Sequence, residues 1–206
     1  MKRIATILVG MTVSLGLVAC GEEEPASDAF EPQSDIEVSE GNEPEASAEL
    51  MSDEGDSVGM VDFILSPDGK LFVEATVNGM EPGYHGFHLH EAPSCEHDHS
   101  NGAFTSAEGH YNPEGEDHGE HAGDFPPLYV NEDGTAQMTF SYDRLNVEDI
   151  AGETSVMIHE GPDNFGHIPD RYQSNEQDES GPDEESLSTG DAGDRVACGV
   201  VESSQQ

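Results

Sequence analysis

Short apolar runs separated by turn residues dominate the chain from about residue 48 onward. Residues 57–64 and 70–79 alternate apolar and polar side chains around the turn SPDGK at 66–70, a pattern that predicts a β-hairpin. Further strands are predicted at residues 136–142, 154–159 and 195–201, with an edge strand at residues 48–51. No segment has a long helical period, so the sequence predicts an all-β fold.

Two connections in this pattern are too long to be ordinary turns. They cover residues 91–128 and 160–194. Loops of this length in a compact domain are usually functional. Residues 48–206 are enough for one domain with its own core, so we expect a single domain whose two long loops carry its chemistry.

The N-terminus has the layout of an export signal. Two basic residues precede an apolar run over residues 4–17, which is too short to span a bilayer. LVAC at residues 17–20 resembles a bacterial lipobox, which implies cleavage and acylation at Cys20. We therefore predict a signal peptide at residues 1–19 and a lipid anchor on Cys20. The anchor would hold the protein outside the cytoplasm, to a membrane of the cell envelope, in the periplasm or at the cell surface.

The mature chain is strongly acidic. Residues 20–47 are rich in Glu, Ser and Pro, cannot bury enough apolar surface to fold, and are predicted to form a disordered tether. The whole chain has 45 acidic and 6 basic residues, and loss of Lys2 and Arg3 with the signal leaves 4 basic residues, a net charge of −41. This charge excludes nucleic acid as a partner.

Seven side chains in the middle of the chain have the types and spacing of a two-metal site. They are His88, His90, His110, His118, His121, Asp124 and His159. The segment 86–91 reads as a strand, so the first two imidazoles point to the same face. Gly, Pro and Asn residues in the segment 110–124 favour a folded loop that can gather its ligands around one ion. The last histidine ends the apolar run 154–159 and can project toward the same region.

A single histidine in an acidic exported protein is more often a solvated surface residue than a ligand. Seven ligand-type residues with agreeing spacing and loop chemistry favour a metal site instead. Imidazole suits both zinc and copper, whereas three imidazoles with one carboxylate in a closed set suit zinc better than a redox metal.

Six motifs resemble the copper–zinc superoxide dismutase family, in order, over about residues 47–202. They are GYHGFHLHE (83–91), GHYNP (109–113), HAGDFPPL (121–128), DGTA (133–136), HEGPDN (159–164) and GDAGDRVACGVV (190–201). The resemblance implies an eight-stranded Greek-key β-barrel or sandwich with two long functional loops. It also implies an enzyme that converts superoxide to dioxygen and hydrogen peroxide by alternating the redox state of copper.

The resemblance also implies how the ligands divide. Copper falls on four histidines, His88, His90, His110 and His159. Zinc falls on His110, His118, His121 and Asp124. His110 would therefore bridge the two ions and relay a proton.

Further residues receive roles from the same resemblance. Arg195 would stand at the mouth of the copper channel, where a permanently charged fork of donors suits a small anion. Asp163 would bond the outer nitrogens of one copper and one zinc ligand, fixing their rings. Cys95 and Cys198 would form the intrachain disulfide, which fits an oxidising compartment.

Other histidines are expected outside the metal set. His85 would be structural, hydrogen-bonded beneath the barrel. His97 and His99 form a second HxH pair outside the family pattern, in a polar segment that predicts a solvated loop. The alternative for this pair is a weak auxiliary site for metal capture.

Charge fits this function least well, because a surface so acidic repels superoxide. Where the family often has a lysine that attracts the anion, this chain has Ser188. We therefore hypothesise a working environment of high salt, which screens distant acids. Two other functions stay open: a copper carrier or chaperone on the same fold, and a structural or adhesive lipoprotein. The resemblance also allows a homodimer.

Overall fold

A computed structural model describes residues 43–97 and 102–204 of the chain. The predicted signal peptide, Cys20, most of the predicted tether and His99 lie outside the described residues. Within the described ranges, no helix is long and apolar enough to cross a membrane.

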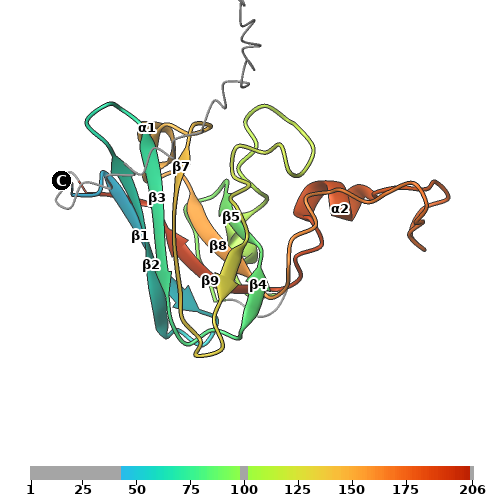
Figure 1. Cartoon of the computed structure of the whole chain (residues 1–206), viewed down its shortest axis with the longest axis horizontal. Helices are drawn as coiled ribbons and strands as arrows, with labels where there is room; N and C mark the ends of the chain where they lie inside the picture. Colours follow the sequence, from blue (N-terminus) through green and yellow to red (C-terminus); the bar gives the residue numbers. More distant parts are fainter. Residues whose placement is uncertain (1–42, 98–101, 205–206) are drawn as a thin grey trace, which may run out of the picture. The chain divides into compact units, whose positions relative to one another are not determined.

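The described chain consists mainly of short strands with three helical turns (Figure 1). The strands are β1 (Ala46–Ser52), β2 (Ser57–Leu65), β3 (Leu71–Val77), β4 (Gly83–His85), β5 (Phe87–His90), β6 (Leu128–Val130), β7 (Ala136–Tyr142), β8 (Ser155–His159), β9 (Arg195–Val200) and β10 (Glu202–Ser203). The helical turns are η1 (Thr105–Ala107), α1 (Val147–Ile150) and α2 (Glu184–Thr189).

The strands form an antiparallel barrel. One sheet has the order β5-β8-β9-β1-β2-β3-β7, with β10 beside β1, and β4 pairs with β6 in a second sheet. Only Gly86 separates β4 from β5, and only Val201 separates β9 from β10, so each pair is one interrupted strand. On that count the described residues form eight strands, and the predicted all-β barrel is confirmed. The chain crosses between β3 and β4, which are not neighbours in the sheets, as in a Greek key.

The core fills the inside of the barrel. Alternate residues of β3 are buried, as a period-two strand with one face on a core requires, and β2 buries Val58, Val61 and Phe63. Phe125 packs against Phe87 with ring centroids 5.1 Å apart and against Phe63 at 6.5 Å. Phe125 directly follows Asp124, so this packing anchors the end of the loop that carries most of the candidate ligands.

One strand prediction was wrong in its position. Residues 48–51 were expected to form an edge strand, whereas β1 pairs with β2 on one side and with β9 and β10 on the other. β1 also begins at Ala46, within the last two residues of the predicted tether. Ala46 is fully buried and Ser47 Oγ donates to Asp62 Oδ1 at 2.6 Å. These tertiary contacts extend the strand beyond the residues that the sequence pattern predicts.

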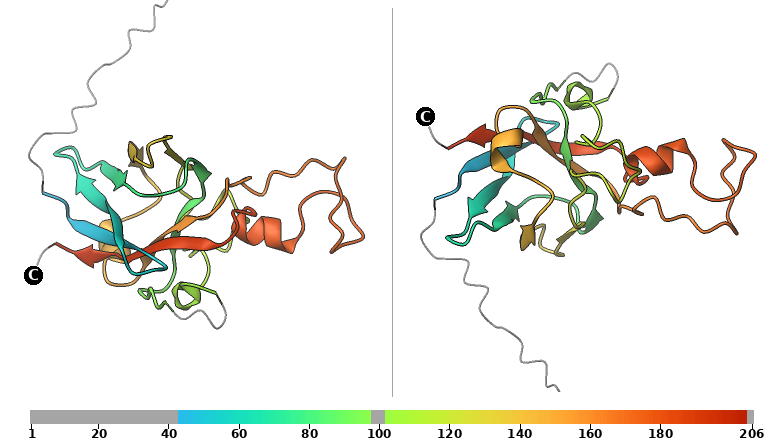
Figure 2. Two further views of the ribbon diagram at one scale, coloured as in Figure 1. Left: turned by 90° about the horizontal axis from the view of Figure 1, so that it is seen from below. Right: turned by 90° about the horizontal axis from the view of Figure 1, so that it is seen from above.

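The second long loop, drawn orange to red, extends away from the barrel (Figure 2). The second loop contains α2, which the sequence analysis did not predict. Its signals were nevertheless present: Asp183 caps the first turn by accepting a hydrogen bond from Ser186 N, and Gly190 ends the helix in the left-handed conformation.

Candidate metal centre

Strand β5 presents two histidines to the first long loop. His88 and His90 are fully buried, while Phe87 and Leu89, which alternate with them along the strand, belong to the barrel core. Isolated bridges pair His88 with Asp124 and His90 with His110, so β5 is tied directly to the loop. The predicted common face of the two imidazoles is therefore what brings them to the loop ligands.

Four histidines converge at the first candidate position. They are His88, His90, His110 and His159, whose candidate ligand atoms all lie within 4.8 Å of one another. All four are buried. Because they come from β5, the loop and the end of β8, the position depends on the tertiary fold.

A second group of three histidines and one aspartate lies next to the first. Its members, His110, His118, His121 and Asp124, also lie within 4.8 Å of one another. Asp124 Oδ1 is 3.0 Å from His110 Nδ1 and 3.2 Å from the Nδ1 atoms of both His118 and His121. Three imidazoles and one carboxylate in a closed set fit a tetrahedral zinc ion.

Unpartnered ring nitrogens provide the test of whether the first group fits a metal. Within the part of the chain that the structure describes, His88 Nδ1, His90 Nε2 and His159 Nε2 are buried with no hydrogen-bond partner. Three such nitrogens would be unfavourable in a site that binds nothing. The residues present therefore fit a metal with nitrogen ligands.

Hydrogen bonds to the opposite ring nitrogens fix the tautomers. His88 Nε2 donates to Asp163 Oδ2 at 2.7 Å, and His90 Nδ1 donates to Glu108 O at 2.9 Å. His159 Nδ1 donates to Gly193 O at 3.1 Å. In each ring the bonded nitrogen carries the proton, so the unpartnered one holds the lone pair that a metal requires.

The electrostatic environment differs between the two groups. Burial lowers the pKa values of His110 and His159 to about 3, so both rings are neutral at pH 7, as ligands must be. Burial also acts to lower the pKa of His118, but hydrogen bonds and charges from Asp124 and Asp163 outweigh it and raise that pKa to about 9. A zinc ion that bound at neutral pH would therefore have to displace a proton from His118.

Asp163 links the two groups from outside. Its Oδ2 accepts from His88 Nε2 at 2.7 Å and its Oδ1 accepts from His118 Nε2 at 2.8 Å. Phe165 N also donates to Oδ1 at 2.6 Å. Burial acts against ionisation, but the bonds from His118 and His88 hold the pKa of Asp163 well below its usual range. The carboxylate is therefore a charged acceptor that orients one ring of each group.

Arg195 begins β9 opposite His159 in the strand register. Its Nη1 donates to Phe104 O and its Nη2 donates to Glu108 O, both at 2.6 Å. Phe104 and Glu108 flank η1 and both have left-handed φ angles, 60° and 62°. Because Glu108 O also accepts from His90, one carbonyl connects the guanidinium to a candidate copper ligand.

The predicted disulfide between Cys95 and Cys198 is confirmed. It joins the first long loop to β9, three residues after Arg195. Phe104, Ala107 and Met157 pack around Cys198 in a small core of their own. The disulfide and this core together hold η1, and hence the carbonyls of Phe104 and Glu108, against β9.

Removal of the disulfide should lower stability strongly. We expect the Cys95→Ser/Cys198→Ser double variant to lose about 4 to 5 kcal/mol in free energy of unfolding, because a loop of roughly 100 residues is no longer closed in the unfolded chain. Urea unfolding followed by circular dichroism measures the loss. A difference below about 1 kcal/mol would show that the closed loop contributes little.

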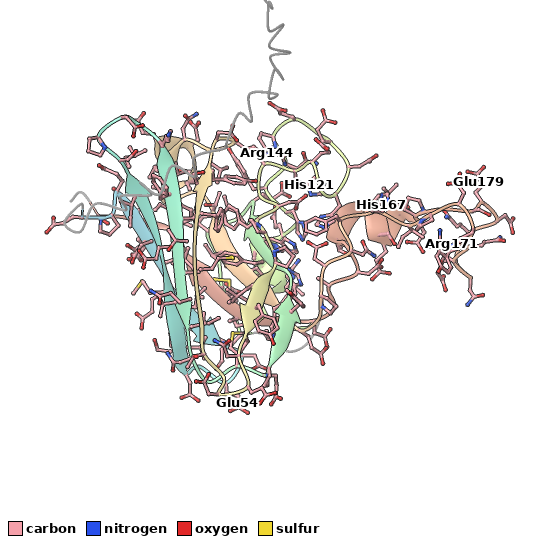
Figure 3. All side chains as sticks on the ribbon, viewed as in Figure 1. Glu54, His121, Arg144, His167, Arg171 and Glu179 are labelled. Carbon is pink, nitrogen blue, oxygen red and sulfur yellow. A yellow bond between two sulfur atoms is a disulfide. The ribbon has the colours of Figure 1, made fainter. Side chains whose placement is uncertain are left out.

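Two residues that support the second group were missed by the sequence analysis. Tyr142 Oη lies 3.0 Å from the carbonyls of Ala122 and Asp124, and burial raises the pKa of Tyr142 to about 12, which keeps its proton available. Arg144 Nη1 donates to His121 O at 3.1 Å, and these two residues are neighbours in Figure 3. Neither stands in a motif, so no sequence signal marks them.

Among the described residues, His85, His97 and His167 lie outside both groups. His85 Nδ1 is 2.7 Å from His159 O and His85 Nε2 is 2.9 Å from Glu81 O, which places this buried ring under the site as a structural contact. The ring of His97 contacts Phe104 with centroids 5.1 Å apart. A role for His97 and His99 in metal capture stays a prediction.

Acid should destabilise the metal-free protein. His110 and His159 have folded pKa values of about 3 against an ordinary value of 6.5, so their contribution is present above pH 6.5 and is lost as the pH falls toward 3. The lowered pKa values of Asp124 and Asp163 add a loss below their ordinary value of 3.8. His118, raised to about 9, acts in the opposite sense and loses its contribution between pH 6.5 and 9.

We therefore expect a stability maximum near neutral pH and an acid limb that steepens by up to about 1.4 kcal/mol per pH unit for each proton taken up on unfolding. Urea unfolding in 1 M NaCl, where the Debye length is about 3 Å, separates this effect from repulsion among surface acids. Stability that stays constant from pH 7 to 4 would contradict the burial of neutral histidines.

Barrel and site together define a class: an antiparallel β-barrel metalloprotein with two adjacent metal positions that share one histidine. The sequence comparison agrees, because residues 57–201 match the family described as copper/zinc superoxide dismutase. The chain belongs to this family, whose metals are copper and zinc.

Individual relatives give the same result. A superoxide dismutase [Cu-Zn] of Mycolicibacterium paratuberculosis is 36% identical over 168 residues, which are 77% of this chain and 74% of the relative. One of Mycobacterium bovis is 38% identical over 133 residues, and the match covers 61% of this chain and 55% of that protein. The solved Cu/Zn superoxide dismutase of Brucella abortus is similar at 31% identity with a TM-score of 0.56, covering 77% of this chain and all of that one.

Proposed function

We propose that the protein is a copper–zinc superoxide dismutase that converts two superoxide anions and two protons to dioxygen and hydrogen peroxide. The observation that carries this function is the set of three buried, unpartnered ring nitrogens beside a closed group of three histidines and one aspartate. The first group suits copper because its four donors are imidazole nitrogens, and the second, with three imidazoles and one carboxylate, suits zinc.

We assign copper to His88, His90, His110 and His159, and zinc to His110, His118, His121 and Asp124. When bound, copper supplies one-electron oxidation and reduction, while zinc supplies fixed charge and geometry. His110 is shared by the two groups, with Nδ1 directed to Asp124. Its Nε2 is then the atom that can hold a proton for the substrate.

Arg195 binds the anion through its charge, and its two bonds to Phe104 O and Glu108 O keep the guanidinium in place. No carboxylate of the residues that the structure describes forms an ion pair with it. Hydrogen bonds to carbonyls leave the positive charge of the group uncancelled, whereas an ion pair would neutralise it. This supports a role for Arg195 in orienting superoxide.

Purified protein without its lipid, loaded with copper and zinc, tests the proposal through metal content and superoxide consumption. We expect about one copper and one zinc per chain together with turnover, as the two groups of four ligands imply. Full loading without turnover would favour the copper carrier instead. No metal at either position would favour a structural lipoprotein.

The place of action is the second part of the proposal. We propose that cleavage after residue 19 and acylation of Cys20 anchor the protein to a membrane of the cell envelope, where it protects against superoxide outside the cytoplasm. The disulfide between Cys95 and Cys198 supports an oxidising compartment. Cys20→Ser should release the protein into the soluble fraction, and an unchanged membrane fraction would contradict lipid anchoring. A homodimer stays a prediction, which sedimentation of the purified protein would test.

Electrostatic attraction of superoxide should be weak, and a lysine at position 188 should strengthen it. Ser188 lies on α2, where its Oγ donates to Glu184 O at 2.6 Å. Gly190, two residues further on, lies directly against the ring of His118. We expect Ser188→Lys to raise kcat/KM at low salt by about 2- to 10-fold, because a local cation steers the anion. Ser66→Lys, which changes the net charge equally in the β2–β3 turn, should raise it less.

Salt dependence of the unaltered protein completes this test. With 45 acidic residues in the chain, added salt should leave kcat/KM unchanged or raise it, since salt screens repulsion. A steep and continuous fall of kcat/KM with salt would show that attraction dominates and would contradict the hypothesis of a high-salt environment.

A further inference from the structure

Helix α2 contacts the candidate zinc group at its C-terminal end. His118 N donates to Leu187 O at 2.8 Å, so the helix holds the backbone of one ligand. The helix ends at Gly190, whose φ of 64° is left-handed. The residue at position 190 therefore lies where α2 meets the metal site.

Gly190 stands directly against the bond between Asp163 and His118. A Cβ atom at position 190 would lie less than 3.0 Å from both Asp163 Oδ1 and His118 Nε2. These are the two atoms of the 2.8 Å hydrogen bond that connects the bridging carboxylate to the zinc group. The bond can therefore form only against a residue without a side chain.

A network of hydrogen bonds keeps Gly190 in this place. Asn164 N donates to Gly190 O at 2.9 Å, which ties it to the residue after Asp163. Asp191 Oδ2 accepts from Ser186 Oγ at 2.6 Å and from Asn164 Nδ2. These hydrogen bonds connect α2 and the residues around Gly190 to Asn164, next to Asp163. A contact between a side chain at position 190 and Asp163 therefore cannot be relieved by moving the helix alone.

We propose that Gly190 is a positioning residue for the two-metal site, because its missing side chain lets Asp163 bond His118 and His88 at once. Any side chain at this position must displace the carboxylate or the ring of His118. Displacement breaks the bridge that orients one ring in each group, and zinc affinity falls first because His118 is a member of the zinc group. The inference rests on the proposed function, in which these residues hold copper and zinc.

Zinc affinity of Gly190→Ala, compared with Gly152→Ala, tests the proposal. Gly152 also has a left-handed φ, 79°, but a Cβ there would meet no heavy atom of the described residues within 4 Å. The two variants share the backbone strain and differ in the contact with Asp163. We expect zinc binding to weaken about tenfold or more in Gly190→Ala, the effect of disturbing groups that orient metal ligands. In Gly152→Ala it should stay within about twofold, well below that range.

Cobalt bound in place of zinc gives a second readout that stability alone does not move. The visible absorption spectrum of Co²⁺ reports the arrangement of its ligands, so it should shift in Gly190→Ala and be unchanged in Gly152→Ala. Equal zinc affinities and equal spectra in the two variants would overturn the role of Gly190.

A milder variant keeps the proposal testable if Gly190→Ala does not fold. Asp191→Gly suits the left-handed φ of 53° at that position but removes both side-chain bonds that hold the segment against Asn164. We expect a several-fold loss of zinc affinity with the Co²⁺ spectrum shifted in the same direction. An affinity and spectrum equal to those of the unaltered protein would contradict the proposal.

The unaltered protein separates the two ideas. If it binds no zinc, both the proposed function and the role of Gly190 in zinc binding are wrong. If it binds zinc and the two glycine variants are alike, only the role of Gly190 is wrong.

Discussion

Asp163→Asn should weaken both metals, by about 10- to 100-fold each, the range for groups that orient metal ligands. An aspartate accepts from two rings at once, as Asp163 does from His88 Nε2 and His118 Nε2. An asparagine presents one oxygen and one NH2, so one of the two ring N–H groups would face a donor. Titrations with copper and zinc, followed by metal analysis after dialysis, measure the two affinities.

The matched control is Asp62→Asn. Asp62 is a half-buried carboxylate in β2 that accepts from Ser47 Oγ at 2.6 Å, away from both metal groups. The substitution Asp62→Asn removes the same charge from the chain as Asp163→Asn. We expect both metal affinities to stay within about twofold of the unaltered protein, outside the range for ligand-orienting groups. Equal losses in Asp62→Asn and Asp163→Asn would mean that net charge, rather than the bridge, sets affinity.

Arg195→Ala should lower kcat/KM for superoxide by about 10- to 100-fold, within the range for electrostatic attraction of a small anion. Six basic residues are present in the whole chain, and Arg195 starts the strand opposite His159. Its removal takes away the cation beside the copper group and leaves the substrate facing a strongly acidic chain. Pulse radiolysis or a competition assay at low salt measures the change, with metal content determined on the same samples.

Two further substitutions show what Arg195 does. Arg171→Ala removes an equal charge from the second loop, where Arg171 stacks over Tyr172 at 4.7 Å, and should change kcat/KM little. Arg195→Lys keeps the charge but replaces the two donor nitrogens, Nη1 to Phe104 O and Nη2 to Glu108 O, by one ammonium nitrogen on a flexible chain. If Arg195→Lys has full activity, charge alone suffices and the two carbonyl bonds are not required.

Features that depend on the spacing of nearby residues along the chain could be predicted from the sequence. The two-residue spacing of His88 and His90 predicted a shared face, and the structure brings both rings to the loop ligands. The hairpin around residues 66–70 was predicted from alternation and a turn, and β2 and β3 confirm it. Assigning each histidine to copper or zinc required the family resemblance, since spacing alone left the metals open.

Other features depend on contacts that no local pattern contains. Tyr142 and Arg144 reach the zinc loop from β7 and the chain beyond it, across about 20 residues of sequence. Residues 48–51 were expected to form an edge strand, yet β9 and β10 return from the C-terminus to pair with β1. The close approach of Gly190 to Asp163 likewise exists only after the second loop has folded over the first.

The two metal positions are joined twice, through the ring of His110 and through the carboxylate of Asp163. Whichever ion binds first fixes both connecting groups, so the second finds its ligands already ordered and pays less entropy. Such coupling is reciprocal: zinc must raise the affinity for copper by the same factor by which copper raises the affinity for zinc. The pair is therefore expected to load cooperatively, and half-filled protein should be scarce when both metals are present.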